Sequence, residues 1–246
     1  MARKARCSFI SNVYHLMVQG DEKKSIFDLS ANKRKYLYFL KHDAFKNDVD
    51  IISYCMMDNH AHVLVYCPEI ERISQMMHEC NTSYAIFYNK KRNKVGHVFR
   101  DRFKSETIFT KSHLMNCIRY IHENPVKAGI CVSCDEYRFS SYKEMNQIRK
   151  EVLNACGLTK AMIQDLINHP HTDDKYMDNE NQKTDLMELF QRIQNQYHFD
   201  LLSKKGFVKM YIKIKTESNE TDKAIADFFQ MDRNQLYRLL KEAGLK

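Results

Sequence analysis

The stretch that most constrains the fold is residues 49–67, VDIISYCMMDNHAHVLVYC. It consists of two apolar runs joined by the polar pair Asp58-Asn59. Short apolar runs bounded by turn-forming residues are typical of buried strands. The sequence therefore predicts two strands with a short connection, and their apolar density predicts that they lie near the centre of a sheet.

The second of these strands carries His60 and His62, separated by Ala61. Side chains alternate across a strand, so both imidazoles point to the same face. Their Cα atoms should lie roughly 6.5–7 Å apart, which lets the two rings converge on one cation. An arbitrary pair of this kind is more often structural. In a buried strand, however, two adjacent imidazoles need a partner, which favours a metal site.

Composition narrows the class of protein. The chain has 246 residues, enough for one large domain or two smaller ones. Its net charge of +8 and pI of about 8.9 favour an anionic partner. No run approaches the ~18 apolar residues of a membrane span, and the basic start lacks the apolar core of a secretory signal.

The cysteines also indicate a reducing, cytoplasmic environment. The eight cysteines are scattered and lie mostly in apolar runs, as is typical of reduced thiols. Cys131 and Cys134 form a single CxxC without a second pair at zinc-ribbon spacing, so no metal is expected there. We therefore expect a cytoplasmic protein with no membrane partner.

Periodicity predicts the elements around the central hairpin. These are a strand over residues 8–19, helices over 30–46, 69–91 and 111–124, and an extended segment over 95–109. Pro125 is expected to end the last helix, because the residue before a proline is pushed out of the α region.

The extended segment alternates aromatic and cationic residues. Its cations Arg100, Arg102 and Lys104 are interleaved with Phe99 and Phe103. Such a pattern suits single-stranded nucleic acid, because the cations can contact its phosphate backbone while its bases stack on the aromatic rings. A solvated edge strand guarded by charges is an equally good interpretation of this segment alone.

The helix over 111–124 places three polar residues at four-residue steps. Asn116, Tyr120 and Asn124 therefore share one face. A tyrosine hydroxyl and an amide oxygen can thus face the same site. By itself this pattern is weak, because tyrosines on helices usually serve packing.

The C-terminal region differs in character. Residues 168–183 contain few apolar groups and predict a linker or exposed loop. Residues 221–244 then predict a helix-turn-helix, in which Thr221 and Asp232 cap the two helices. An ordinary helical bundle is the alternative interpretation. The side chains expected to enter a DNA groove are Arg233, Asn234, Gln235 and Arg238.

These observations predict three regions. Residues 1–150 form a catalytic domain, 151–183 a helical connector and linker, and 184–246 an all-α DNA-binding region.

Four motifs occur in a fixed order: NHAHVLV, VFRDRF, YIHENPVKAG and YRFSSY. Over about residues 8–145 they resemble the single-tyrosine HUH transposases, and most closely the REP-associated tyrosine transposases. The ordered set, above all YIHENPVKAG after the histidines, is more specific than the histidine pair. One departure is Ala61, where a bulkier apolar residue is common; alanine still permits the strand.

The resemblance implies an α+β fold, with a ferredoxin-like antiparallel sheet and helices on one face. It implies that Tyr120 is the nucleophile and that His60, His62 and Asn124 bind Mg²⁺ or Mn²⁺. The expected activity is metal-dependent nicking of single-stranded, hairpin-containing DNA, followed by strand transfer through a 5′-phosphotyrosine.

Two other functions fit the same scaffold. One is a regulator that binds a DNA hairpin without cutting it, and the other is a relaxase or replication initiator. The intact set of Tyr120, His60, His62 and Asn124 favours the enzyme. The lack of a helicase motif and a different motif order speak against the relaxase. The sequence leaves the recognised DNA open, as well as the choice between a monomer and a homodimer.

Overall fold

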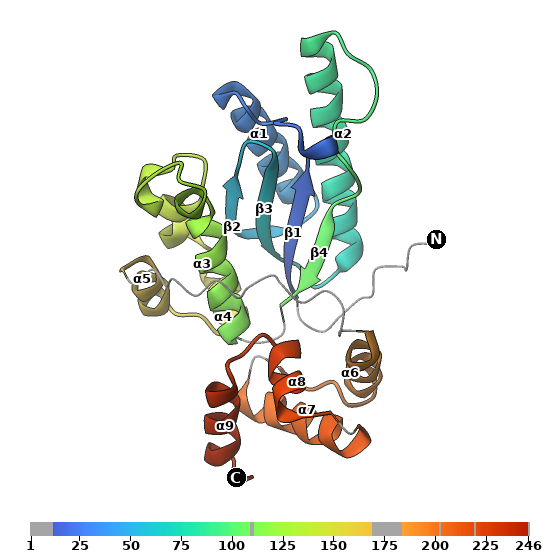
Figure 1. The fold of residues 1–246 in the computed structure, drawn as a ribbon, viewed down its shortest axis with the longest axis vertical. Helices are drawn as coiled ribbons and strands as arrows, with labels where there is room; N and C mark the ends of the chain where they lie inside the picture. Colours follow the sequence, from blue (N-terminus) through green and yellow to red (C-terminus); the bar gives the residue numbers. More distant parts are fainter. Residues whose placement is uncertain (1–11, 109–110, 169–183, 202, 219, 246) are drawn as a thin grey trace.

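The computed structural model of the protein describes residues 12–108, 111–168, 184–201, 203–218 and 220–245. Within these residues, four antiparallel strands form one sheet in the order β2-β3-β1-β4 (Figure 1). Its elements are β1 (Val13–Gln19), α1 (Ser30–Lys46), β2 (Asp50–Met56), β3 (His60–Tyr66), α2 (Ile70–Arg92) and β4 (Lys104–Thr107). This βαββαβ order is that of the ferredoxin-like fold, so the predicted fold class is confirmed.

The predicted hairpin is the centre of this sheet. Strand β3 pairs with β2 on one side and with β1 on the other. Its residues from Ala61 to Val65 are all buried. In the connection between β2 and β3, the carbonyl groups of Asp58 and Asn59 accept hydrogen bonds from the backbone N–H groups of Phe27 and Gly20, respectively. The chain before α1 thus fixes the connection between the two strands.

Helices α1 and α2 cover one face of the sheet (Figure 1). The core there is rich in aromatic and sulfur-containing side chains. Its largest buried members include Tyr14, Leu16, Phe27, Tyr36, Leu40, Met56, Ile73 and Tyr84. The hydroxyl of Tyr84 donates to the carbonyl oxygen of Ile26 at 2.6 Å, so this buried phenol is paired.

The opposite face is covered by α3 (Lys111–Lys127), which packs against β2 and β3. Here Leu114, Ile118 and Ile121 contact the sheet residues Cys55 and Leu64 in a second core. This corrects the expectation that helices lie on one face only. The physical reason is that the sheet carries buried apolar side chains on both faces, so each face needs a packed layer.

Helix α3 also runs further than predicted. It continues through Pro125 to Lys127 instead of ending at Asn124. Pro125 lies in the last turn, where its ring removes only the N–H that would have bonded to the carbonyl of Ile121. The amide of Ala128 still donates to the carbonyl oxygen of Asn124 at 3.0 Å.

The predicted extended segment over 95–109 is a strand only in part. Strand β4 is limited to Lys104–Thr107, which pair with residues 14–17 of β1. Upstream, a single bridge joins Phe99 to Gly20. Residue 109 lies outside the described residues.

The segment that carries the YRFSSY motif runs along the outer edge of β2. The amide of Met56 donates to the carbonyl of Phe139, and the amide of Ser141 donates to the carbonyl of Tyr54, both at 2.9 Å. The Ser141 hydroxyl also lies 3.0 Å from Nε2 of His122 on α3. The motif therefore ties the edge of the sheet to α3.

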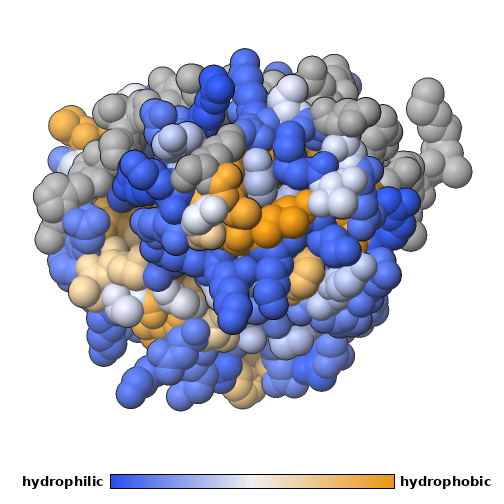
Figure 2. All heavy atoms as spheres, turned by 90° about the horizontal axis from the view of Figure 1, so that it is seen from below, coloured by the Kyte–Doolittle hydropathy of each residue, from blue (hydrophilic) through white to orange (hydrophobic). Residues whose placement is uncertain are grey.

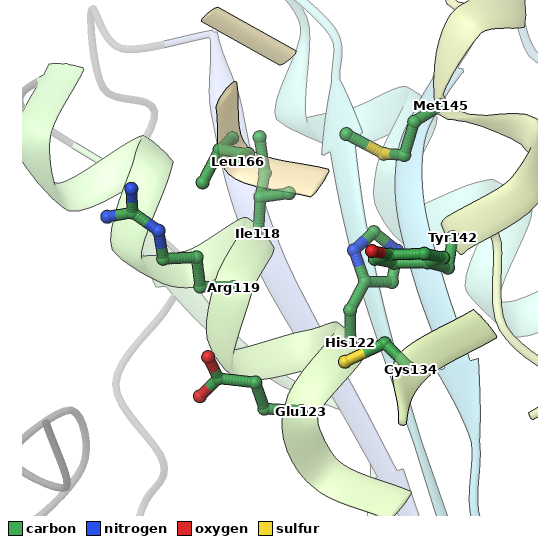
Figure 3. A pocket seen from close by; sticks show the side chains of 8 residues that line it. All are labelled: Ile118, Arg119, His122, Glu123, Cys134, Tyr142, Met145 and Leu166. Atoms are coloured by element: carbon green, nitrogen blue, oxygen red, sulfur yellow. The ribbon is translucent and has the colours of Figure 1, made fainter. Parts of the chain in front are cut away.

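A small cavity lies between α3 and the segments that follow it (Figure 3). Its volume is about 10 Å³, roughly the room that one water molecule needs. It is lined by Ile118, Arg119, His122, Glu123, Cys134, Tyr142, Met145 and Leu166. None of the predicted site residues lines this cavity, and it cannot hold a nucleotide.

Two short helices complete the second core. They are α4 (Lys150–Ala155) and α5 (Lys160–Asn168), and they follow the 3₁₀ turns η2 (Cys134–Glu136) and η3 (Tyr142–Gln147). The buried side chains of these helices and of Leu158 between them belong to the same apolar cluster as α3: Val152, Leu153, Leu158, Ile163 and Leu166. The predicted boundary at residue 150 thus falls inside a packed core, and the packing favours a boundary after residue 168.

The C-terminal helices have a core of their own. They are α6 (Thr184–Tyr197), α7 (Lys204–Glu217), α8 (Asp222–Phe228) and α9 (Arg233–Glu242). Large buried members of this core include Phe190, Ile193, Phe207, Met210, Ile225, Phe229, Leu236 and Leu240. The predicted linker over 168–183 lies outside the described residues except for Asn168.

The predicted caps of the last two helices are present. The Thr221 hydroxyl accepts a hydrogen bond from the Ala224 amide at 3.1 Å. Asp232 forms a capping box with Gln235. Between the helices Gln230 has a positive φ of 48°, which makes the turn tight.

The C-terminal end of the molecule is mainly hydrophilic on its surface. Figure 2 shows it from below, with hydrophilic side chains surrounding a smaller apolar area. None of the helices within the described residues is long and apolar enough to cross a membrane.

A fragment 1–150 should be much less stable than a fragment 1–168. The shorter fragment loses five buried aliphatic side chains, each contributing roughly 1.5–3 kcal/mol, against a typical domain stability of about 5–15 kcal/mol. Urea unfolding should give a cooperative transition for 1–168 and none for 1–150. Equal unfolding midpoints would show that α4 and α5 do not support the second core.

Replacing the buried His122 should change how stability depends on pH. Burial lowers its pKa to about 3, whereas in the unfolded chain it titrates near 6.5. Below pH ~6.5 the unfolded chain binds the extra proton, so the free energy of unfolding falls as pH falls, by up to ~1.4 kcal/mol per pH unit.

The variant His122→Gln lacks this titration. Urea unfolding in EDTA between pH 7.5 and 4.5 should therefore show a flatter pH dependence for the variant than for the wild type. Parallel curves would contradict a neutral, buried His122.

Candidate active site

The two histidines of β3 lie side by side, as the strand pattern predicts. Their ring centroids are 4.9 Å apart, with the ring planes at 84°. His62 is buried, with 1% of its surface exposed, and His60 is half-buried. The pair therefore lies at the border between the second core and the surface.

Helix α3 brings Tyr120 to this pair. The Tyr120 ring meets the His62 ring edge-on, with a centroid distance of 5.3 Å. The Tyr120 side chain is half-buried. Because Ile118 and Ile121 are held in the second core, the helical period leaves Tyr120 facing the histidines rather than solvent.

Asn124 follows one turn later on the same helix. Its Nδ2 donates to the backbone carbonyl oxygen of Tyr120 at 2.7 Å. The amide oxygen of Asn124 remains available as an acceptor or metal ligand. This hydrogen bond holds the Asn124 side chain against the turn of α3 that carries Tyr120.

Burial sets the charge state of the histidines. It holds the pKa of His62 well below its usual range and also lowers the pKa of His60. Both imidazoles are therefore neutral at physiological pH. A neutral imidazole is the form that binds a metal ion.

The same burial acts against the phenol. It raises the pKa of Tyr120, and the charge of Glu106 on β4 raises it further. A hydrogen bond from the Asn124 side chain and the charge of Lys127 work in the opposite direction. The ammonium group of Lys127 lies 6.0 Å from the centre of the Tyr120 ring.

The donor set fits a divalent cation. Nδ1 of His60 lies 2.7 Å from Oδ1 of Asn59; since this oxygen only accepts, Nδ1 carries the proton and Nε2 keeps its lone pair. Within the described residues no three His, Cys, Asp or Glu side chains are grouped to hold a metal. An amide oxygen can also bind such a cation, and Asn124 shares the helix face of Tyr120, as does Asn116.

A third histidine, His15 on β1, belongs to the same cluster. Its Nε2 lies 3.0 Å from Nδ1 of His62, and its side chain is buried, with 2% of its surface exposed. Sequence reasoning placed His15 on a strand but gave it no role. The available signal was strand order, because the ferredoxin-like fold places β1 beside β3.

The predicted DNA contacts on the extended segment lie at the edge of this site. Arg100, Arg102 and Lys104 are all exposed. Lys104 pairs with Met17, which pairs in turn with His62, so the three residues form one row across the sheet. Cross-strand neighbours share a face, so Lys104 lies on the same face as the histidines.

The C-terminal helices reach the same side of the sheet. Nε2 of Gln230, in the turn before α9, donates to Oε1 of Glu106 at 2.7 Å. On α9 itself, Arg233, Asn234 and Arg238 are exposed. Gln235 is exposed as well, and its side-chain oxygen accepts a hydrogen bond from the Asp232 amide at 3.2 Å in the capping box.

Comparison with known proteins agrees with this geometry. A family model described as Transposase IS200 like matches residues 8–124. A solved structure of a REP-associated tyrosine transposase bound to a REP hairpin superposes with a TM-score of 0.50 and 16% identity. The match covers 73% of this chain and 96% of that chain. No curated protein sequence matches the chain.

At this identity the structural match shows the fold alone, while the sequence match covers the strand with the histidine pair and helix α3 as far as Asn124. The resemblance found in the sequence is confirmed. The model of the IS200-like transposase family matches residues 8–124, just under half of this chain.

Proposed function

We propose that this protein is a transposase-like enzyme that nicks single-stranded DNA beside a hairpin and transfers the cut strand. The observation that carries the proposal is the placement of Tyr120. Its ring lies 5.3 Å from the ring of His62, and Asn124 follows one turn later. This placement supports a role for Tyr120 as a nucleophile beside neutral nitrogen and oxygen donors.

In this proposal His60, His62 and Asn124 hold Mg²⁺ or Mn²⁺. The cation, when bound, would polarise the scissile phosphate and offset the charge that develops on it. The protein's own contribution is to keep both imidazoles neutral by burial and to fix the ring of His60 through Asn59.

The phenol oxygen of Tyr120 then attacks the phosphorus in line. A bond forms between this oxygen and phosphorus, and the bond from phosphorus to the 3′ oxygen breaks. The phenol gives up its proton and the leaving oxygen takes one up, which yields a 5′-phosphotyrosine and a free 3′-OH. Because the phosphodiester energy is kept in the covalent link, rejoining needs no ATP.

Two neighbours of Tyr120 favour this step. The Asn124 hydrogen bond and the charge of Lys127 both lower the phenol pKa, which burial raises. They stabilise the phenolate that must form during the attack.

The DNA partner is inferred from exposed cations. Arg100, Arg102 and Lys104 lie at the sheet edge beside the site, and Arg233 and Arg238 lie on α9. The superposed relative is bound to a REP hairpin. Both observations support single-stranded DNA with a hairpin as the substrate.

Covalent capture of DNA should depend on the Tyr120 hydroxyl. Tyr120→Phe removes this oxygen alone, so hairpin binding should survive while the covalent adduct, measured on denaturing gels with Mn²⁺, falls below detection. Tyr88→Phe, on α2 away from the histidines, should form the adduct as the wild type does.

The same assay tests the metal. EDTA or His62→Ala should abolish the adduct, and Asn124→Ala should weaken it less. An adduct in Tyr120→Phe would place the nucleophile elsewhere. Tight hairpin binding without any adduct in the wild type would favour the non-cutting regulator.

The exposed arginines of α9 should supply DNA affinity but not chemistry. Removing two phosphate contacts with Arg233→Ala and Arg238→Ala should lower the slope of log K against log salt by up to ~1.4–1.8. The comparison is Lys204→Ala with Lys213→Ala on α7, where Lys204 is paired with Glu242. Fluorescence anisotropy of labelled hairpin DNA at several salt concentrations measures the slope for both double variants. An unchanged slope in the arginine variant would exclude α9 from the DNA interface.

A further inference from the structure

The buried contact between His15 and His62 has a chemical consequence that depends on where its proton lies. Nε2 of His15 and Nδ1 of His62 are 3.0 Å apart, which is a hydrogen bond. Two neutral imidazoles can share this bond in only two ways, because one nitrogen must donate and the other accept. The two arrangements leave His62 with opposite properties.

We propose that His15 is a positioning residue that holds His62 in its metal-binding tautomer. In this arrangement Nδ1–H of His62 donates to Nε2 of His15, and Nε2 of His62 keeps its lone pair for a cation. The reverse arrangement would put the proton on Nε2 of His62 and block that ligand. The inference rests on the proposed role of His62 as a metal ligand.

The neighbouring histidine shows the same pattern. Nδ1 of His60 is also the engaged nitrogen, and its partner is Oδ1 of Asn59 at 2.7 Å. Both histidines of the pair thus use Nδ1 for a supporting hydrogen bond, which leaves both Nε2 atoms for the site. A supporting hydrogen bond to the second ring nitrogen is a general feature of metal-binding histidines.

The position of His15 makes it suited to this task. It lies on β1, next to the central strand, and its ring stacks on that of His62 with centroids 5.1 Å apart and an interplanar angle of 24°. Its ring also meets Tyr120 edge-on at 6.1 Å. Strand β1 is paired with β3 on one side and with β4 on the other, so the position of His15 is fixed. In this proposal His15 therefore restricts the rotation of the His62 ring as well as the position of its proton.

The tautomer can be observed without metal or DNA. Long-range ¹H–¹⁵N spectra of metal-free, ¹⁵N-histidine-labelled protein distinguish protonated from unprotonated ring nitrogens. His62→Gln and His15→Gln assign the two signals. We expect His62 and His15 both to be protonated on Nδ1. A His62 ring protonated on Nε2 would overturn the proposal.

Metal affinity provides a second measurement. His15→Gln offers an amide oxygen in place of Nε2 as acceptor, whereas His15→Leu fills the space without one. In calorimetric titration with Mn²⁺, His15→Leu should bind ~10–100-fold more weakly than the wild type, and His15→Gln should recover most of the affinity.

The matched control is His122→Leu, which removes a histidine that is equally buried but contacts Ser141. It should bind Mn²⁺ as the wild type does. If His122→Leu weakens binding as much as His15→Leu, the effect is general destabilisation and the proposal fails. Equal affinity of His15→Leu and wild type also overturns it.

These failures differ from failure of the proposed function. Loss of the proposed function would appear as a wild type that binds no Mn²⁺ or forms no adduct. Failure of this inference alone would leave Mn²⁺ binding and adduct formation intact in His15→Leu.

Discussion

The pairing of β3 with both β1 and β2 is the constraint on which the rest of the structure depends. The sheet built around β3 has buried apolar side chains on both faces, so the fold needs α1 and α2 behind it and α3 in front. The front layer carries the residues of the candidate site. The histidines that α3 covers and the tyrosine that α3 carries therefore meet at the same packed interface, and the site is a consequence of core packing.

Much of this site follows from short-range periodicity. The alternation of a strand places His60 and His62 on one face, and the helical repeat places Tyr120 and Asn124 on another, so both pairs could be predicted. The histidine pair and the Tyr120–Asn124 pair come together because α3 packs on the sheet, and periodicity alone does not predict that packing. The resemblance to the transposases supplied that link.

The features that prediction missed depend on contacts between distant segments. His15 gains its partner from strand order, which brings residues 47 positions apart within 3.0 Å. The apolar residues of α4 and α5 have helical spacing, but nothing in that spacing says that they pack against α3. The capping role of Gln235 was not foreseen either: its side-chain oxygen accepts a hydrogen bond from the backbone N–H of Asp232.

Burial has opposite effects on the two halves of the site. It favours uncharged groups, so it keeps the imidazoles neutral and at the same time holds the phenol of Tyr120 in its protonated, weakly nucleophilic form. The charge of Glu106 raises the pKa of Tyr120 further. The side chain of Gln230, in the C-terminal region, donates a hydrogen bond to the Glu106 carboxylate. A cation bound by the imidazoles, as proposed, would lower the pKa of the Tyr120 phenol electrostatically. It would thereby oppose the effect of burial, which raises that pKa.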